Sequence, residues 1–364
     1  MIDEILMKKQ WSKKDLIYLL ELSQEEDIKK LFQYANKIRI QYVGKEVYYR
    51  GLIEFSNICN KDCLYCGIRK SNTKVMRYQM EKEEILREAL WAYQEQYGSI
   101  TLQSGEQTNS NYVKFCEDII LEINKKTKHA LGITISMGEQ EKEIYQKWFN
   151  AGASRYLLRI ETSNELLYQK IHPQNENHSF QTRLACLRYL KDIGYQVGSG
   201  VMIGIPGQTC EDLANDLLFF EREDIDMIGM GPYIEQKDTP LYQQIEKVGY
   251  PILRDKQWRF QMSLKMIAIA RILLKDVNIA ATTALQALDP LGREKALKAG
   301  ANVLMPIITN EEQRQKYQLY DQKPCINETA AQCKECLQRR VLSIANEIGY
   351  GKKGDSTHFL KRIR

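Results

Sequence analysis

The sequence predicts an α/β fold, a closed (β/α)8 barrel of the TIM type, and three observations support this prediction. Eight short apolar segments alternate with longer amphipathic ones between about residues 50 and 306. The 364 residues are enough for one barrel with extensions at both ends. Hydrophobic residues make up 43% of the chain and charged residues 27%, which excludes disorder and fibrous repeats. An open, doubly wound sheet has the same alternation and stays the alternative.

The predicted elements divide the chain into three parts. Residues 1–45 form a segment of short helices, in which Ser12 lies in a helix start signal and Ser23 opens a capping-box pattern. Residues 46–310 form the barrel. Residues 311–364 form a C-terminal extension with three cysteines and a last helix around Val341–Ile348. The predicted strands are Leu52–Phe55, Ser99–Gln103, Gly132–Ser136, Tyr156–Ile160, Gly198–Ile203, Met227–Met230, Ile279–Thr282 and Asn302–Met305. The predicted barrel helices are Lys82–Tyr97, Tyr112–Lys125, Glu139–Ala151, Glu165–Ile171, Phe180–Ile193, Cys210–Glu223, Gln257–Leu274 and Arg293–Ala299.

Charge and hydropathy exclude two classes of partner. Lysine and arginine outnumber aspartate and glutamate by only 52 to 47, and the excess is spread along the chain rather than clustered as on a nucleic-acid-binding surface. The chain lacks an apolar run of the ~20 residues that span a bilayer. Its first residues place acids before bases without a continuous apolar core, unlike a signal peptide. We therefore expect a cytoplasmic protein that binds neither nucleic acid nor membrane.

Six of the nine cysteines lie in two short groups, which in a reducing compartment indicates metal binding rather than disulfides. The first group, Cys59, Cys63 and Cys66, has the spacing C-x3-C-x2-C and follows the first predicted strand, at the end of a barrel where active sites lie. Three thiolates in so short a loop can hold three irons of a [4Fe–4S] cluster and leave the fourth without a protein ligand. Structural zinc is the alternative, but it needs a fourth ligand and the nearest histidine is the distant His129.

This spacing at this place resembles the radical S-adenosylmethionine (SAM) superfamily. The resemblance implies that SAM binds the open iron through its amino and carboxylate groups. It further implies that one electron from the cluster splits SAM into methionine and a 5′-deoxyadenosyl radical, and that Tyr65, between the last two cysteines, approaches the adenine.

Residues at the ends of other predicted strands are candidates for SAM binding. Gly105 follows the second strand, where the superfamily has a glycine turn whose backbone receives the SAM ammonium. Glu161 can accept hydrogen bonds from ribose hydroxyls, and Arg159 or Arg183 can pair with a carboxylate. An exposed salt bridge is the alternative for Arg159 and Glu161, and packing is the alternative for Met227. The whole candidate set is Tyr65, Gln103, Ser104, Gly105, Glu106, Thr134, Arg159, Glu161, Arg183 and Met227.

Several longer stretches, between about residues 45 and 340, are similar to the FeFe-hydrogenase maturase family HydE and occur in the same order. Biotin synthase and methylornithine synthase share the first cysteine group, so that group does not separate the three families. The stretches are Glu54-Phe55-Ser56-Asn57, Cys63-Leu64-Tyr65-Cys66-Gly67-Ile68-Arg69, Leu102-Gln103-Ser104-Gly105-Glu106, Arg155-Tyr156-Leu157-Leu158-Arg159, Gly204-Ile205-Pro206-Gly207-Gln208-Thr209, Gly229-Met230-Gly231-Pro232 and Ala281-Thr282-Thr283-Ala284.

The second cysteine group, Cys325, Cys333 and Cys336, has the spacing C-x7-C-x2-C. It resembles the auxiliary cluster site of many HydE proteins and is not expected in methylornithine synthase. The resemblance implies an optional second iron–sulfur cluster, [2Fe–2S] or [4Fe–4S], with no catalytic role. A zinc site completed by a distant residue is the alternative.

The resemblance to HydE also implies a substrate and partners. The substrate is an iron–cysteine complex carrying carbon monoxide and cyanide, which becomes part of the two-iron subcluster of FeFe-hydrogenase. The partners are the radical SAM enzyme HydG, the scaffold GTPase HydF, and a reductant such as ferredoxin or flavodoxin. An anionic substrate needs fixed donors at the barrel mouth. The candidates for this pocket are Ser136, Thr282, Thr283, Met305, Tyr317 and Tyr320, together with Arg159.

Two alternative functions stay open at this point. One is another radical SAM enzyme, such as methylornithine synthase or a sulfur-inserting enzyme like biotin synthase. The other is a non-catalytic iron–sulfur carrier or scaffold. A carrier has no use for the SAM candidates Gly105, Glu106, Arg159 and Glu161, so these residues favour an enzyme.

Overall fold

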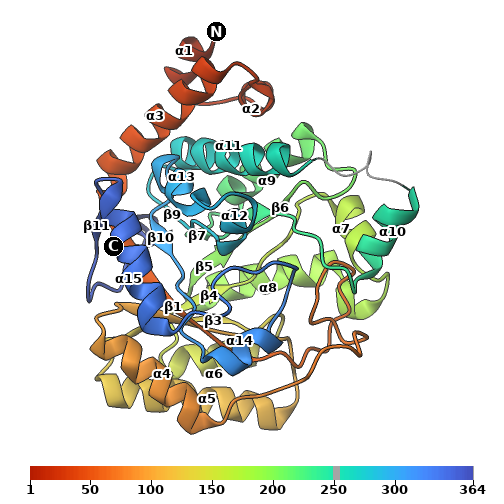
Figure 1. Cartoon of the computed structure of the whole chain (residues 1–364), viewed down its shortest axis with the longest axis vertical. Coiled ribbons are helices and arrows are strands. Elements are labelled where there is room, and N and C mark those ends of the chain that lie inside the picture. Colours follow the sequence, from red (N-terminus) through yellow and green to blue (C-terminus); the bar gives the residue numbers. More distant parts are fainter. Residues whose placement is uncertain (249–254, 364) are drawn as a thin grey trace.

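The computed structural model describes residues 1–248 and 255–363, and parallel strands ringed by helices lie at its centre (Figure 1). The strands pair in the order β10-β1-β2-β3-β4-β5-β7-β9. A parallel bridge between Ala280 and Val303 joins the two ends of this path, and the Asn302 N–H donates to Ile279 O at 2.9 Å. The sheet closes on itself, so the predicted (β/α)8 barrel is confirmed.

The strand bounds differ from the predicted ones mainly in the second half of the barrel. Two predicted strands each break into two pieces, Gln196–Ser199 (β5) with Met202–Ile203 (β6), and Met227–Ile228 (β7) with Gly231–Pro232 (β8). At the break, a Cβ on Gly200 would lie 2.1 Å from Gly229 O, so only glycine fits there. The other strands are Glu46–Ser56 (β1), Ser99–Ser104 (β2), Gly132–Ser136 (β3), Arg155–Leu157 (β4), Asn278–Ile279 (β9), Val303–Leu304 (β10) and Glu347–Ile348 (β11).

All eight predicted barrel helices are present, with ends that differ by a few residues at most. Two short helices, α10 and α12, were not predicted, and a 3-10 turn precedes α8. The elements are Lys82–Gln94 (α4), Ser110–Thr127 (α5), Lys142–Asn150 (α6), Glu165–Ile171 (α7), Glu176–His178 (η1), Phe180–Ile193 (α8), Cys210–Arg222 (α9), Pro240–Val248 (α10), Lys256–Leu274 (α11), Thr283–Leu288 (α12) and Gly292–Lys298 (α13).

The N-terminal segment contains three helices, Ile2–Leu6 (α1), Lys13–Glu21 (α2) and Glu25–Val43 (α3). Ser12 caps α2 as predicted, because the Asp15 N–H donates to Ser12 Oγ and the Ser12 N–H donates to the Asp15 carboxylate. The capping box predicted at Ser23 is wrong. Gln24 precedes α3 and its side chain makes no capping hydrogen bond. The segment is held by tertiary packing instead, α3 against α11 and α2 against α9.

The C-terminal extension differs most from its prediction. The helix predicted at Val341–Ile348 lies earlier in the chain, at Ala330–Ser343 (α15), after a short helix at Glu311–Lys316 (α14). Thr329 and Gln332 form a capping box that starts α15, and Ala345 ends it with a left-handed φ of +56°. The next residues form β11, which pairs in parallel with the first residues of β1. Figure 1 shows α15 and β11, in blue, beside that edge of the barrel.

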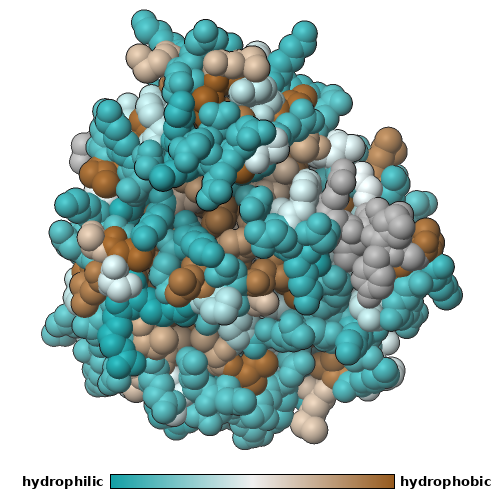
Figure 2. Space-filling model, turned by 45° about the horizontal axis from the view of Figure 1, so that its top comes forward, coloured by the Kyte–Doolittle hydropathy of each residue, from teal (hydrophilic) through white to brown (hydrophobic). Residues whose placement is uncertain are grey.

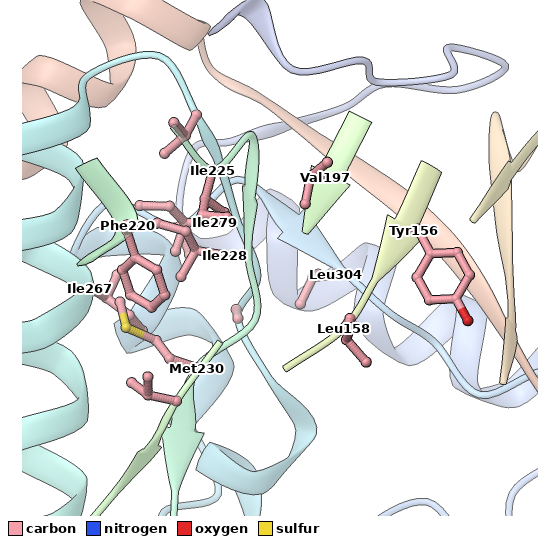
Figure 3. Close-up of a cluster of buried hydrophobic side chains, with 14 of the residues drawn as sticks. Tyr156, Leu158, Val197, Phe220, Ile225, Ile228, Met230, Ile267, Ile279 and Leu304 are labelled. Carbon is pink, nitrogen blue, oxygen red and sulfur yellow. The ribbon is translucent and has the colours of Figure 1, made fainter. Parts of the chain in front are cut away.

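The core lies between the barrel and its helices, and Figure 3 shows one part of it. Phe220 of α9 and Ile267 of α11 are fully buried against Ile228 of β7 and Ile279 of β9. Burial of each such side chain contributes about 1.5–3 kcal/mol, so this layer holds α9 and α11 on the sheet. On the face drawn in Figure 2, hydrophobic residues occupy small areas between hydrophilic ones. Within residues 1–248 and 255–363, no helix has the length and apolar character needed to cross a membrane.

The last residues close the barrel at the amino ends of its strands. Gly354 O accepts hydrogen bonds from Arg50 Nη2 at 3.1 Å and from Asn278 Nδ2 at 2.9 Å. Asp355 forms an ion pair with the fully buried Arg155 of β4. The final helix, Thr357–Arg362 (α16), follows directly. The end of the chain therefore has a structural role, because the Gly354 carbonyl and the Asp355 carboxylate compensate buried arginines at the barrel floor.

A testable consequence concerns His358 of α16. Hydrogen bonds from its imidazole to Asp276 and Asp224 raise the pKa of His358 from 6.5 to about 9. Because the folded-state pKa is the higher one, the stabilisation is complete below pH 6.5 and is lost as the pH rises to 9. Over this range we expect the free energy of unfolding to fall by about 1–3 kcal/mol more in the natural protein than in His358→Gln. Urea unfolding at a series of pH values measures this difference, and equal falls in both proteins would contradict it.

Candidate functional site

The first cysteine group lies in the loop that follows β1, at the carboxyl end of the barrel strands. Cys59, Cys63 and Cys66 are all partly buried and form no disulfide. Burial of the sulfur atoms raises the pKa of all three thiols, that of Cys66 to about 12. A thiolate here therefore needs a bound cation to compensate its charge, as iron does when it displaces the proton.

Arg77 holds this loop in shape. Its guanidinium donates hydrogen bonds to Asn57 O at 2.7 Å, Ile68 O at 2.8 Å and Arg69 O at 2.6 Å. These carbonyls lie on both sides of the three cysteines in the sequence. One side chain thus closes the loop around the three thiols, and the sequence analysis missed it because the residue lies outside the cysteine motif.

The turn after β2 lies directly against the cysteine loop. A Cβ on Gly105 would lie 2.3 Å from Ile58 O and 2.8 Å from Cys59 Cβ, so the backbones approach as only glycine allows. The Glu106 N–H donates to Cys59 Sγ at 3.3 Å, and the Asn60 N–H donates to Glu106 O at 2.7 Å. The close backbone approach predicted at Gly105 is present, and it brings the turn after β2 against the cysteine loop.

Four buried charged side chains surround this contact. Lys61 Nζ lies 3.1 Å from Glu106 Oε1 and 2.7 Å from Glu139 Oε2, and Arg183 Nε lies 2.7 Å from Glu139 Oε1. All four residues are at most 9% exposed, and their formal charges cancel. Glu106 and Arg183 were candidates from the sequence, whereas Lys61 and Glu139 were not. The position of Lys61 between two of the cysteines was the available signal.

Arg159 and Glu161, which follow β4, form a pair with two hydrogen bonds. Arg159 Nε and Nη2 donate to the two carboxylate oxygens of Glu161, each at 2.9 Å, and Nη1 donates to Gly229 O at 2.7 Å. Glu161 adopts a left-handed φ of +66°, a costly conformation that is typical of functional sites. Arg183 Nη1 donates to Arg159 O at 3.0 Å and so connects this pair to the buried charges. The pair is partly buried, in contrast to the exposed salt bridge considered as its alternative.

Tyr65, between the second and third cysteines of the loop, packs against His172 at the end of α7. Its ring meets the ring of His172 edge-on, with centroids 5.4 Å apart. Burial lowers the pKa of His172 to about 3, so the imidazole is neutral at physiological pH. Its Nδ1 lies 2.9 Å from Tyr168 O, which leaves Nε2 to face the Tyr65 hydroxyl at 3.5 Å. His172 was not a sequence candidate, and it fixes the orientation of Tyr65.

Three candidates come together in a small cavity of about 30 Å³ inside the barrel. Thr134 of β3, Met227 of β7 and Met305 after β10 all line it. The hydroxyl of Thr134 is buried without a hydrogen-bond partner in the described part of the chain, and Met227 Sδ accepts a hydrogen bond from Arg50 Nη1 at 2.9 Å. Sequence reasoning placed Thr134 and Met227 with SAM and Met305 with the substrate, but here they share one cavity.

The C-terminal extension contributes to the barrel mouth. Tyr317 is buried, and its hydroxyl accepts a hydrogen bond from Gln103 Nε2 at 3.2 Å. Lys323 Nζ lies 2.6 Å from both carboxylate oxygens of Glu54, at the end of β1. This ion pair is almost fully buried and was missed, since its partners are 269 positions apart. The remaining pocket candidates are Ser136 at the end of β3, Thr282 and Thr283 at the start of α12, and Tyr320 in the extension, all partly buried.

The second cysteine group is divided between a loop and a helix. Cys325 lies in the loop before α15 with a left-handed φ of +64°, and Cys333 and Cys336 lie one turn apart within α15. None of the nine cysteines, all of which lie in the described part of the chain, forms a disulfide, as the prediction of metal ligands requires.

These features define a class of protein. Three thiols at the carboxyl end of a (β/α)8 barrel fit a [4Fe–4S] cluster with one iron free of protein ligands. The tight backbone contact at Gly105 and the neutral set of buried charges form a wall beside them. Residues 53–220 match the family model of the radical SAM superfamily. The fold and site are those of a radical SAM enzyme, which uses a [4Fe–4S] cluster and SAM.

A comparison with curated proteins identifies the particular family. The [FeFe] hydrogenase maturase subunit HydE of Thermotoga maritima is 42% identical over 95% of this chain and 94% of its own length. A 3-methylornithine synthase of Methanosarcina acetivorans is 29% identical over 88% of this chain and 86% of its own length. The chain belongs to the HydE family of radical SAM hydrogenase maturases, as the sequence predicted.

Solved structures support the fold. A crystal structure of methylornithine synthase superposes with a TM-score of 0.81 over 96% of this chain and 97% of that chain, at 24% identity. The likeness therefore covers nearly the whole of both chains and shows that they share a fold.

The buried charges beside the cysteine loop give a testable prediction. Lys61→Met leaves Glu106 and Glu139 with one cation between them, and loss of a buried partner costs about 3–5 kcal/mol. The matched control is Lys70→Met, at an exposed position in the same loop, where we expect a change within about 0.5 kcal/mol. Anaerobic urea unfolding of both variants measures the difference, and equal stabilities would show that Lys61 does not compensate these carboxylates.

Proposed function

We propose that this chain acts on an iron–cysteine complex that carries carbon monoxide and cyanide, as a step in assembly of the two-iron subcluster of FeFe-hydrogenase. The proposal rests on its membership of the HydE family and on one observation, the three free thiols in the loop after β1 with the Gly105 backbone held against them. In this proposal Cys59, Cys63 and Cys66 hold the [4Fe–4S] cluster and leave one iron for SAM.

The SAM ligands follow from the site around that iron. The backbone at Gly105 and Glu106 faces the cysteine loop and receives the SAM ammonium. Arg183, with a second bond to the backbone of Arg159, supplies positive charge for the carboxylate. The Glu161 carboxylate accepts from the ribose, and the Tyr65 ring covers the adenine. Gln103 and Ser104 complete the wall from β2, whereas Thr134 and Met227 line the cavity inside the barrel together with Arg50.

When bound, the cluster and SAM supply a one-electron reductive cleavage that forms a carbon-centred radical. The chain's own residues must then hold the reactants still and exclude water. Lys61 holds the wall next to the cluster in place, because its ammonium fixes the carboxylates of Glu106 and Glu139. The buried ion pair of Glu54 and Lys323 holds the C-terminal extension in place at the barrel mouth.

The substrate is anionic, and the barrel mouth offers it cations and hydroxyls. Arg159 is fixed by Glu161 and by Gly229 O, so its guanidinium keeps one orientation while it faces a ligand. Ser136, Thr282 and Thr283 lie at the carboxyl ends of β3 and β9 and provide hydroxyl donors. Met305, Tyr317 and Tyr320 form the remaining side of the pocket.

The family places the chain in the hydrogenase maturation machinery. We propose HydG as the enzyme that makes the substrate, HydF as the acceptor of the product, and a ferredoxin or flavodoxin as reductant. We further propose that Cys325, Cys333 and Cys336 bind a second iron–sulfur cluster. Cys333 and Cys336 lie one turn apart on α15, so both thiols leave the helix on the same side.

The radical chemistry is tested directly by product analysis. Anaerobically reconstituted protein with dithionite and SAM should release methionine and 5′-deoxyadenosine, and Cys63→Ser should release less than about a hundredth as much, because three protein ligands are needed. Cys210→Ser is the matched control and should match the natural protein, since Cys210 lies in α9 outside the cysteine loop. Chromatography of the two products gives the result, and an undiminished yield from Cys63→Ser would reject this cluster site.

The maturation role is tested in cells. An FeFe-hydrogenase expressed with HydG, HydF and this chain should be active, and the same hydrogenase without this chain should show background activity only. Cys63→Ser should behave like omission of the chain. Hydrogen evolution measures the outcome, and full activity without this chain would contradict the proposed function.

A further inference from the structure

The second cysteine group has a carboxylate among its sulfur atoms. The thiols of Cys325 and Cys333 and a carboxylate oxygen of Glu328 lie within 4.8 Å of one another. Cys325 and Glu328 come from the loop before α15, and Cys333 comes from its first turn. The sequence analysis counted only cysteines in this segment and therefore missed Glu328.

Cys336, the remaining cysteine of the motif, is not one of these three neighbouring donors. It lies three residues after Cys333 in α15, on the same side of that helix. Cys336 therefore lies one helical turn beyond Cys333, and Cys333 itself lies beside Cys325 and Glu328.

An unpaired buried cation lies beside the same donors. Arg293 of α13 is 2% exposed, and its Nη2 donates to Cys325 Sγ at 3.8 Å. Its Nε and Nη1 are buried and have no hydrogen-bond partner within residues 1–248 and 255–363. A buried guanidinium without an anion is costly, and a bound metal–thiolate centre with net negative charge would compensate it.

We propose that Glu328 is the fourth protein ligand of the second iron–sulfur centre, with Cys325, Cys333 and Cys336, and that Arg293 is its counter-cation. This inference rests on the proposed second cluster. A centre closed by three thiolates and a carboxylate has no iron left for SAM or for a substrate. The two centres then differ in their number of protein ligands, because the loop after β1 offers three and the extension offers four.

The inference is tested in the full chain with Cys59, Cys63 and Cys66 replaced by alanine, so that only the second centre is present. After anaerobic reconstitution with iron and sulfide, iron content and EPR spectra are recorded with and without added imidazole. We expect the background protein to bind iron and its spectrum to be unchanged by imidazole. Glu328→Gln should shift the spectrum and make it respond to imidazole, which then reaches an open iron. Glu328→Cys should abolish that response again.

Matched controls separate this inference from the proposal beneath it. Glu335→Gln changes an exposed glutamate of α15 and should behave like the background protein. Arg293→Met should lower the midpoint potential of the centre, and Arg293→Lys should restore part of it. A background protein that binds no iron, or zinc alone, would overturn the second cluster. Iron binding with a spectrum that is indifferent to Glu328→Gln would overturn the role of Glu328 alone.

Discussion

The close contact between the turn after β2 and the cysteine loop after β1 is the constraint on which the rest of the site depends. Three thiols bind a cluster in one precise geometry when their loop is held near that geometry by its surroundings. Gly105 allows the two backbones to meet, and the hydrogen bonds of Glu106 with Cys59 and of Asn60 with Glu106 fix their register. Any side chain at Gly105 would push the loop away from the barrel.

Buried charge pairs give this site its rigidity and connect distant parts of the chain. Lys61, Glu106, Glu139 and Arg183 come from four different strand–helix units, and each is almost fully desolvated. Isolated charges at these depths would be strongly destabilising, so each pair holds only while the surrounding loops keep their positions. The chain therefore folds stably only when these loops are correctly arranged, since only then are the buried charges paired. A radical enzyme benefits, because loops that cannot separate also keep water out.

The C-terminal extension acts at both ends of the barrel. At the floor, Gly354 and Asp355 satisfy buried arginines of β1 and β4. At the mouth, Lys323 pairs with Glu54 and Tyr317 reaches Gln103. The second cysteine group lies between these two contacts in the sequence, so a metal bound there would stiffen the segment that closes the mouth. In our proposal the second centre would thus have a mechanical role that needs no exchange of ligands.

What the sequence determined by itself was everything encoded in short-range patterns. The barrel was predicted from its alternating apolar segments. The first metal site was predicted from three cysteines within eight residues, since few metal centres are bound by cysteines at that spacing. Tertiary structure decided which distant side chains meet. Lys323 and Glu54, Lys61 and Glu139, and Arg293 and Cys325 carry no local signal, because each pairing depends on how strands and loops far apart in the chain are brought together. The last helix was misplaced for a related reason: its residues switch to a strand at Glu347 only because the edge of β1 is there to pair with.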